Sequence, residues 1–167
     1  MKDTFIRLGV LLVTCAALLA FCKDVKAESY EERVILFEDT CTIASVLFDV
    51  SCNLIKTPVI LDMDDEGFRG YYRQENENYV WVHSKLDPIN RKMVIVHEMA
   101  HLILHQSGTV PLSKTNVYQT CLSEVMSFGI SNWYAVTVLK NKALQRRNWI
   151  HDYPHCHFMK EEYIHVP

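Results

Sequence analysis

The spacing of apolar residues along the chain predicts three helices. Ser29 stands at the start of a capping-box pattern and opens a first helix that is expected to reach about Cys52. Asp87 is a favoured helix-capping residue with proline directly after it, and the helix it begins is expected to end near Gly108. A third helix is expected over about 115–141.

Three shorter segments between the first two helices are typical of β-strands. Residues 57–63, 67–74 and 78–83 are rich in β-branched and aromatic side chains. The polar residues 75–77 separate the second segment from the third, so these two are expected to pair as antiparallel strands. The order of elements predicts an α+β fold, in which a small antiparallel or mixed sheet packs against the second helix and a further long helix.

Composition narrows the classes of function. The chain has 167 residues, a net charge of −3 and 49% hydrophobic content, which is enough for one globular core. Its 17 basic and 20 acidic residues include no basic run, so direct binding of nucleic acid through its phosphates is not expected. Residues 28–167 are expected to form a single domain.

The first residues of the chain have the pattern of a targeting segment. Residues 8–22 contain no charge, Lys2 and Arg7 precede them, and Ala27 lies at a suitable cleavage point. The apolar run is shorter than the roughly 17–25 residues of a spanning helix. We therefore expect residues 1–27 to be a signal peptide or a membrane-anchoring segment, and the protein to be secreted or membrane-associated. The alternative is a buried helix in a cytoplasmic protein.

Four cysteines follow this segment, an even number that is compatible with disulfides. Cys41 and Cys52 are expected to share the first helix, where eleven residues of rise place them about 16 Å apart, beyond bridging distance. They are therefore expected to be small buried hydrophobic residues. Cys121 and Cys156 show no C-x-x-C spacing, so no cysteine metal knuckle is predicted.

The second predicted helix contains the sequence VIVHEMAHLILH, and with it H-E-x-x-H. His97 and His101 are four residues apart, so they lie within about 40° of each other around the helix and one turn apart, and can bind one metal ion. Glu98 lies about 100° from His97, where it can reach a water beside the metal and act as general base. The apolar residues on both sides predict that this part of the helix is buried. Burial of two histidines and a glutamate costs free energy unless hydrogen bonds, ion pairs or a metal ion compensate for their lost hydration. The alternative is a set of hydrogen-bonded core histidines.

A catalytic zinc site needs a third protein ligand from elsewhere in the chain. His105 lies two turns beyond His97 and about 80° round, too far to share the ion. It is expected either to support the ligands through a hydrogen bond or to act as a cation at the helix C-terminus. Glu124 lies among apolar residues of the third helix, where an isolated carboxylate needs a cation. Two alternatives to Glu124 as the third ligand remain. Glu124 faces solvent, or the ligand comes from one of the C-terminal histidines His151, His155 and His157.

Four segments of the chain resemble the ImmA/IrrE family of small metallopeptidases. They are GFRGYYRQ, YVWVHSKL, NRKMVIVHEMAHLILH and EVMSFG, and the resemblance covers about residues 30–140. By this resemblance His97, His101 and Glu124 would bind zinc (Zn2+) in a gluzincin-like site, and Glu98 would be the general base. His105 matches a frequent histidine of the family.

The chain departs from the family pattern directly after Glu124. Val125 and Met126 replace the usual small and polar residues, one of which would be expected to hydrogen-bond the ligating carboxylate. Ser123 or Ser127 could substitute for that partner.

The leading hypothesis from the sequence is a zinc-dependent endopeptidase that acts on a protein or peptide substrate. Residues 78–83 are expected to present a strand edge that aligns an extended peptide. Tyr71, Tyr72 or a C-terminal histidine is expected to stabilise the oxyanion, and the sequence does not select among them. The alternative is a regulatory module of the same fold that binds a partner without proteolysis; a third hypothesis is a structural metal site. By the resemblance, a cytoplasmic protein would act on a repressor-type regulator.

Overall fold

The computed structural model describes residues 28–73, 78–111, 116–146 and 153–159. The predicted signal or membrane-anchoring segment 1–27, the predicted turn 75–77 and His151 lie outside the described residues. No helix within the described ranges is both long and apolar enough to cross a membrane.

The three predicted helices are present, and the first two begin where their predicted capping residues place them. Ser29 forms a complete capping box with Glu32, the carboxylate of Asp87 accepts from two backbone N–H groups, and Asn116 caps the last helix in the same way. The helices are α2 (Tyr30–Phe48), α3 (Pro88–Gln106) and α4 (Val117–Thr137), followed by the short 3-10 helices η1 (Lys142–Leu144) and η2 (Pro154–Cys156).

The sheet has three strands, β1 (Val59–Met63), β2 (Gly70–Tyr72) and β3 (Tyr79–His83), in the order β1-β3-β2. β2 and β3 are antiparallel, as predicted, and β1 is parallel to β3, so the sheet is mixed. The prediction that residues 78–83 form a free edge is wrong. β3 is the central strand and pairs with β1 on one side and β2 on the other. The outer edge of the sheet on the β2 side is therefore the edge of β2.

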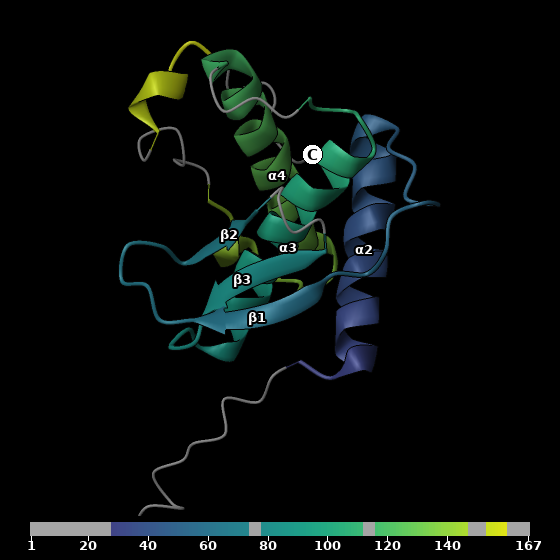
Figure 1. Cartoon of the computed structure of the whole chain (residues 1–167), viewed down its shortest axis with the longest axis vertical. Helices are drawn as coiled ribbons and strands as arrows, with labels where there is room; N and C mark the ends of the chain where they lie inside the picture. Colours follow the sequence, from purple (N-terminus) through teal and green to yellow (C-terminus); the bar gives the residue numbers. More distant parts are fainter. Residues whose placement is uncertain (1–27, 74–77, 112–115, 147–152, 160–167) are drawn as a thin grey trace, which may run out of the picture.

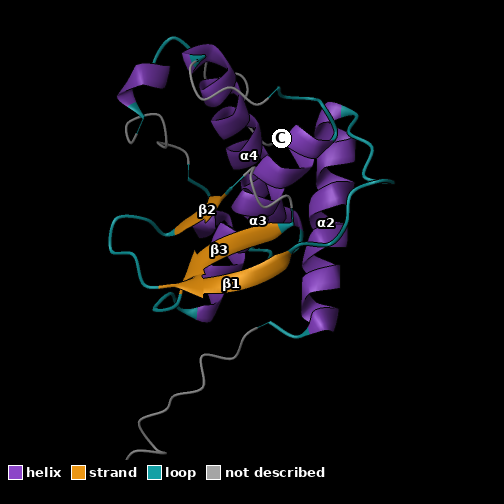
Figure 2. Ribbon diagram, viewed as in Figure 1, coloured by secondary structure: helices purple, strands orange, loops and turns teal. Residues whose placement is uncertain are grey.

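α3 lies at the centre of the fold. The sheet packs on one side of it and α4 on another, while α2 runs beside both helices (Figures 1 and 2). The buried side chains Val80 and Val82 of β3 alternate with exposed or half-buried neighbours, which is typical of a strand with one face on a core. Because α3 is enclosed in this way, the apolar residues on either side of its histidines are fully buried: Ile95, Val96, Leu102, Ile103 and Leu104.

The prediction that Cys41 and Cys52 are not bridged is wrong. α2 ends at Phe48 and not at Cys52, because Asp49 takes a left-handed conformation (φ 54°) and its N–H closes the helix onto Ser45. The chain then turns back along α2. Cys52 therefore comes within 6.1 Å of Cys41, Cα to Cα, and the two form a disulfide.

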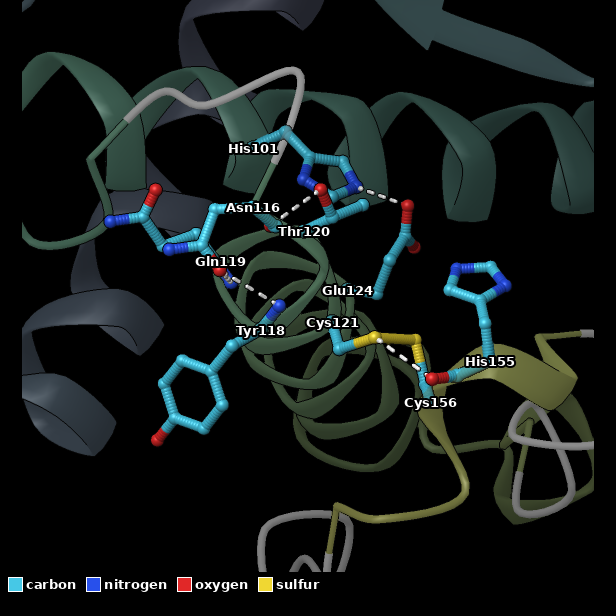
Figure 3. Close-up of a disulfide and its surroundings, with 9 residues drawn as sticks. All are labelled: His101, Asn116, Tyr118, Gln119, Thr120, Cys121, Glu124, His155 and Cys156. Atoms are coloured by element: carbon cyan, nitrogen blue, oxygen red, sulfur yellow. Dashed lines mark hydrogen bonds and ion pairs between the residues drawn. A yellow bond between two sulfur atoms is a disulfide. The ribbon is translucent and has the colours of Figure 1, made fainter.

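A second disulfide joins Cys121, in the first half of α4, to Cys156 in η2. It attaches the C-terminal part of the described chain to the helix that contains Glu124 (Figure 3). Cys121, Cys156 and a ring nitrogen of His155 lie close enough to hold a metal ion, but the two sulfur atoms are bonded to each other and so offer no thiolate.

Candidate metal centre

α3 and α4 bring His97, His101 and Glu124 together. The two imidazole Nε2 atoms on α3 lie 3.2 Å apart. From α4, Glu124 Oε2 lies 3.4 Å from Nε2 of His97, and Oε1 lies 3.6 Å from Nε2 of His101. Figure 3 shows the Glu124 side chain extending from α4 toward the ring of His101. The prediction from sequence that Glu124 meets the histidine pair therefore agrees with its position.

The separations of these four atoms, two imidazole nitrogens and the two oxygens of Glu124, are close to those expected between ligands of one metal ion. Ligands about 2.1 Å from a tetrahedral zinc ion lie about 3.4 Å from one another. The distances here are 3.2, 3.4 and 3.6 Å. Two imidazole nitrogens and a carboxylate oxygen are also ligands that zinc commonly takes in catalytic sites. The donor set therefore fits a single divalent ion.

Burial and charge support the same interpretation. The side chains of His97, His101 and Glu124 are only 12–15% exposed. Within the described residues, Glu124 Oε2 is buried without a hydrogen-bond partner. Burial alone would raise the pKa of Glu124, but the neighbouring His101 and His97 outweigh it and hold that pKa well below its usual range. Glu124 is therefore an ionised carboxylate, as a metal ligand must be.

Ser123 supports the site from behind His101. Its Oγ lies 2.7 Å from His101 Nδ1 and 3.1 Å from His105 Nε2. With Nε2 of His101 facing the metal position, Nδ1–H donates to Ser123, and the serine hydroxyl donates to His105. This fixes the tautomer and the orientation of the His101 ring.

His105 is the far end of this chain of hydrogen bonds. Burial, helped by the neighbouring His101, lowers the pKa of His105 to about 4, so its ring is neutral near pH 7. The lowered pKa argues against the alternative interpretation of His105 as a cation at the helix C-terminus.

The hydroxyl of Ser123 bonds His101 and His105 and not the Glu124 carboxylate, the partner predicted for Ser123 or Ser127, and Ser127 does not fill that role either. It lies one turn beyond Ser123 on α4, and its Oγ has no hydrogen-bond partner within the described part of the chain. Among the C-terminal histidines, His155 and His157 are exposed in and after η2 and are not among the donor atoms around His97.

We expect Ser123→Ala to weaken metal binding by about 10- to 100-fold, because His101 loses the partner that orients its ring. Competition with a chromophoric chelator measures the change. Ser127→Ala is the matched control. It removes a buried hydroxyl group that lies on the same helix face but has no hydrogen-bond partner in the described residues, so it should change the metal affinity by less than about threefold. Equal losses in the two variants would contradict the role of Ser123.

Glu98 lies next to the metal position but is not one of the three donors. It is buried, and burial raises its pKa above the usual value, although His97, His101 and the backbone N–H of Tyr72 in β2 act in the opposite direction. A carboxylate with a raised pKa accepts a proton more readily near neutral pH than an exposed one.

Gly70 allows β2 to approach α3 at Glu98. A Cβ at this position would clash with Cγ1 of Val94 and would lie 3.1 Å from Cγ of Glu98. The missing side chain therefore lets the edge strand pack directly beside Glu98. The sequence pattern predicted a strand over 67–74, but it did not indicate that Gly70 is needed for this close contact.

We expect Gly70→Ala to lower the free energy of unfolding by about 1–3 kcal/mol, because the added methyl group overpacks the contact with α3. Urea denaturation of the full chain measures the change. Gly67→Ala is the control, since a Cβ there meets only the end of the Asp65 side chain, and it should shift stability by about 0.5 kcal/mol or less. No difference between the variants would refute the close approach.

A cleft of about 610 Å³ opens beside His97 and Glu98, in the size range of ligand sites. Its walls come from the region around β2, the first half of α3, the second half of α4 and the segment after η1. Its lining includes three residues that the sequence analysis did not single out, Asn132, Arg146 and Tyr153. A buried asparagine inside an apolar helix could have drawn attention to Asn132, which bonds the backbone of Arg146 on both its N–H and its C=O.

Comparison with known proteins agrees with this geometry. A peptidase-family model described as the IrrE N-terminal-like domain matches residues 35–124. The matched segment contains the whole sheet and α3, and it ends at Glu124. No curated protein and no solved structure matches the chain. Because the match covers more than half of the sequence, the chain belongs to the IrrE N-terminal-like (ImmA/IrrE) family, a metallopeptidase family.

Proposed function

We propose that this protein is a zinc-dependent endopeptidase. The observation that carries the proposal is the cluster of donor atoms from His97, His101 and Glu124: the two imidazole nitrogens lie 3.2 Å apart, and each has a carboxylate oxygen of Glu124 within 3.4–3.6 Å, as suits one tetrahedral ion. A structural zinc site usually has four protein ligands, whereas three ligands beside an open cleft are typical of a catalytic one. The family match supports a peptidase.

Different residues of the chain would bind the metal ion and transfer the proton during hydrolysis. His97, His101 and Glu124 hold the ion, and the hydrogen bond that His101 Nδ1–H donates to Ser123 keeps His101 in the tautomer that presents Nε2. Bound zinc would supply a Lewis acid that polarises the peptide carbonyl and lowers the pKa of water. Glu98 takes the proton of the attacking water and passes it to the departing amine, a role for which burial and a raised pKa suit it.

The edge strand β2 can align the substrate. It pairs with β3 alone in the described part of the chain, and its first residue, Gly70, lines the cleft beside Glu98. An extended peptide that adds to this edge would pass along the cleft next to the metal centre. In this proposal β2 takes the role predicted for residues 78–83, that of aligning the peptide. Binding at a strand edge favours extended or unfolded segments of proteins as substrates.

The test is hydrolysis of a mixture of unfolded proteins by the zinc-loaded full chain, with new N-termini identified by mass spectrometry. The proposal expects defined cleavage sites that disappear with a chelator and return when zinc is added. If the metal-loaded protein generates no new N-termini, the proposal fails, and the non-proteolytic regulatory role becomes the better account of the fold.

A further inference from the structure

The described C-terminal segment, residues 153–159, lies beyond the part of the chain that the family model matches. Two features attach it to α4. The disulfide joins Cys156 to Cys121, one helical turn before Glu124 (Figure 3). Around the disulfide, Met159 from this segment packs with Val125 and Phe128 in a small buried cluster of its own. The segment is therefore held in place by a covalent bond and by apolar burial.

Tyr153 extends from this segment into the wall of the cleft that contains His97 and Glu98. Its ring is half-buried and meets the ring of Phe128 edge-to-face, with centroids 6.3 Å apart. Phe128 in turn packs on the imidazole of His97 at 4.3 Å. A row of three rings therefore runs from the metal centre to the C-terminal segment.

The position of Tyr153 depends on the disulfide. The backbone N–H of Cys156 donates to the carbonyl of Tyr153 at 2.8 Å, so the bridged cysteine also fixes the backbone of Tyr153. Cys156 and Met159 are the two buried hydrophobic residues of the described segment 153–159. Loss of the bridge would therefore release the cleft wall while leaving the three metal-binding side chains on α3 and α4.

We propose that Tyr153 is a specificity-determining residue: its ring, packed on the buried Phe128 and held by the Cys121–Cys156 disulfide, forms an aromatic subsite for a large apolar side chain beside the scissile bond. Phe128 is 4% exposed and lies between the His97 ring and the Arg146 guanidinium, so it supports Tyr153 from behind. The half-buried ring of Tyr153 lines the cleft and offers apolar contact area and ring stacking to such a side chain. This inference rests on the proposed function, since it names the kind of peptide that the cleft accepts.

The experiment measures binding and not turnover. Two short peptide hydroxamates, identical except for a phenylalanine or a glycine side chain next to the metal-binding group, are titrated into zinc-loaded full-length Glu98→Gln protein. We expect the phenylalanine probe to bind about tenfold more tightly, roughly the contribution of one well-packed aromatic contact. Tyr153→Ala in this background should abolish the preference, and Tyr153→Phe should retain it because the ring remains.

Cys156→Ser should also abolish the preference with unchanged zinc content, whereas Cys41→Ser with Cys52→Ser, which removes the disulfide remote from the cleft, should preserve it. A general loss of structure would weaken both probes equally, so the ratio isolates the subsite. An unchanged ratio in Tyr153→Ala overturns the inference. If the ratio behaves as expected while wild-type protein cleaves no peptide, the subsite stands and the endopeptidase proposal falls.

Discussion

Glu98→Gln is expected to reduce peptide hydrolysis by about 100- to 10,000-fold, the usual contribution of a general base. Glutamine has nearly the same shape, so it can keep the packing against Gly70 and the bond from the Tyr72 N–H, but it cannot accept a proton. Because Glu98 is not one of the three donor atoms, the variant should bind zinc at the wild-type stoichiometry. Initial rates on a cleaved peptide, together with elemental analysis, measure both quantities.

A suitable control is Glu38→Gln, an exposed glutamate on α2 remote from the cleft, which should leave the rate within about twofold. If Glu98→Gln cleaves at the wild-type rate, the assignment of the base is wrong. If instead it loses the metal, Glu98 belongs to the ligand set and the mechanism needs revision.

Glu124→Ala is expected to remove the metal from the purified protein. The variant leaves two imidazoles as protein ligands, and it also removes the negative charge that balances the ion within a mostly buried site. The loss of affinity should exceed the roughly 10- to 100-fold expected for a supporting residue such as Ser123. Elemental analysis after dialysis against a weak chelator measures the zinc that remains.

The matched control for Glu124→Ala is His155→Ala, which removes the C-terminal histidine that competes with Glu124 as a ligand in the interpretation of the sequence. His155 is exposed in η2, and its loss should leave the metal content unchanged. Equal zinc in wild type and Glu124→Ala would exclude Glu124 from the site, and loss of zinc in His155→Ala would point to the C-terminal segment instead.

Much of this site could be predicted from local sequence, because it depends on helical geometry. Four residues of helix bring His97 and His101 onto one face, and the capping residue Asp87 fixes where that helix begins. Glu124 was predictable for a different reason, since a carboxylate among apolar residues needs a positive partner. The structure adds the distances, which depend on how α3 packs against α4.

The features that sequence reasoning missed depend on contacts between distant segments or on a single backbone angle. The left-handed conformation of Asp49 reverses the chain after α2, and a helix pattern continued through it gave a false separation of Cys41 and Cys52. The hairpin signal predicted the pairing of β2 with β3, but the parallel addition of β1 has no local signature. Tyr153 lines the cleft from a segment that is joined to α4 by a disulfide spanning 35 residues and by apolar packing.

The central claim is that His97, His101 and Glu124 bind one zinc ion beside Glu98. Anomalous X-ray diffraction at the zinc edge, from crystals of the zinc-loaded full chain, tests it most directly because it locates the ion itself. The account predicts a single strong peak about 2.0–2.2 Å from Nε2 of His97, Nε2 of His101 and a carboxylate oxygen of Glu124. A peak elsewhere in the molecule, or zinc-loaded crystals with no peak between α3 and α4, would contradict it.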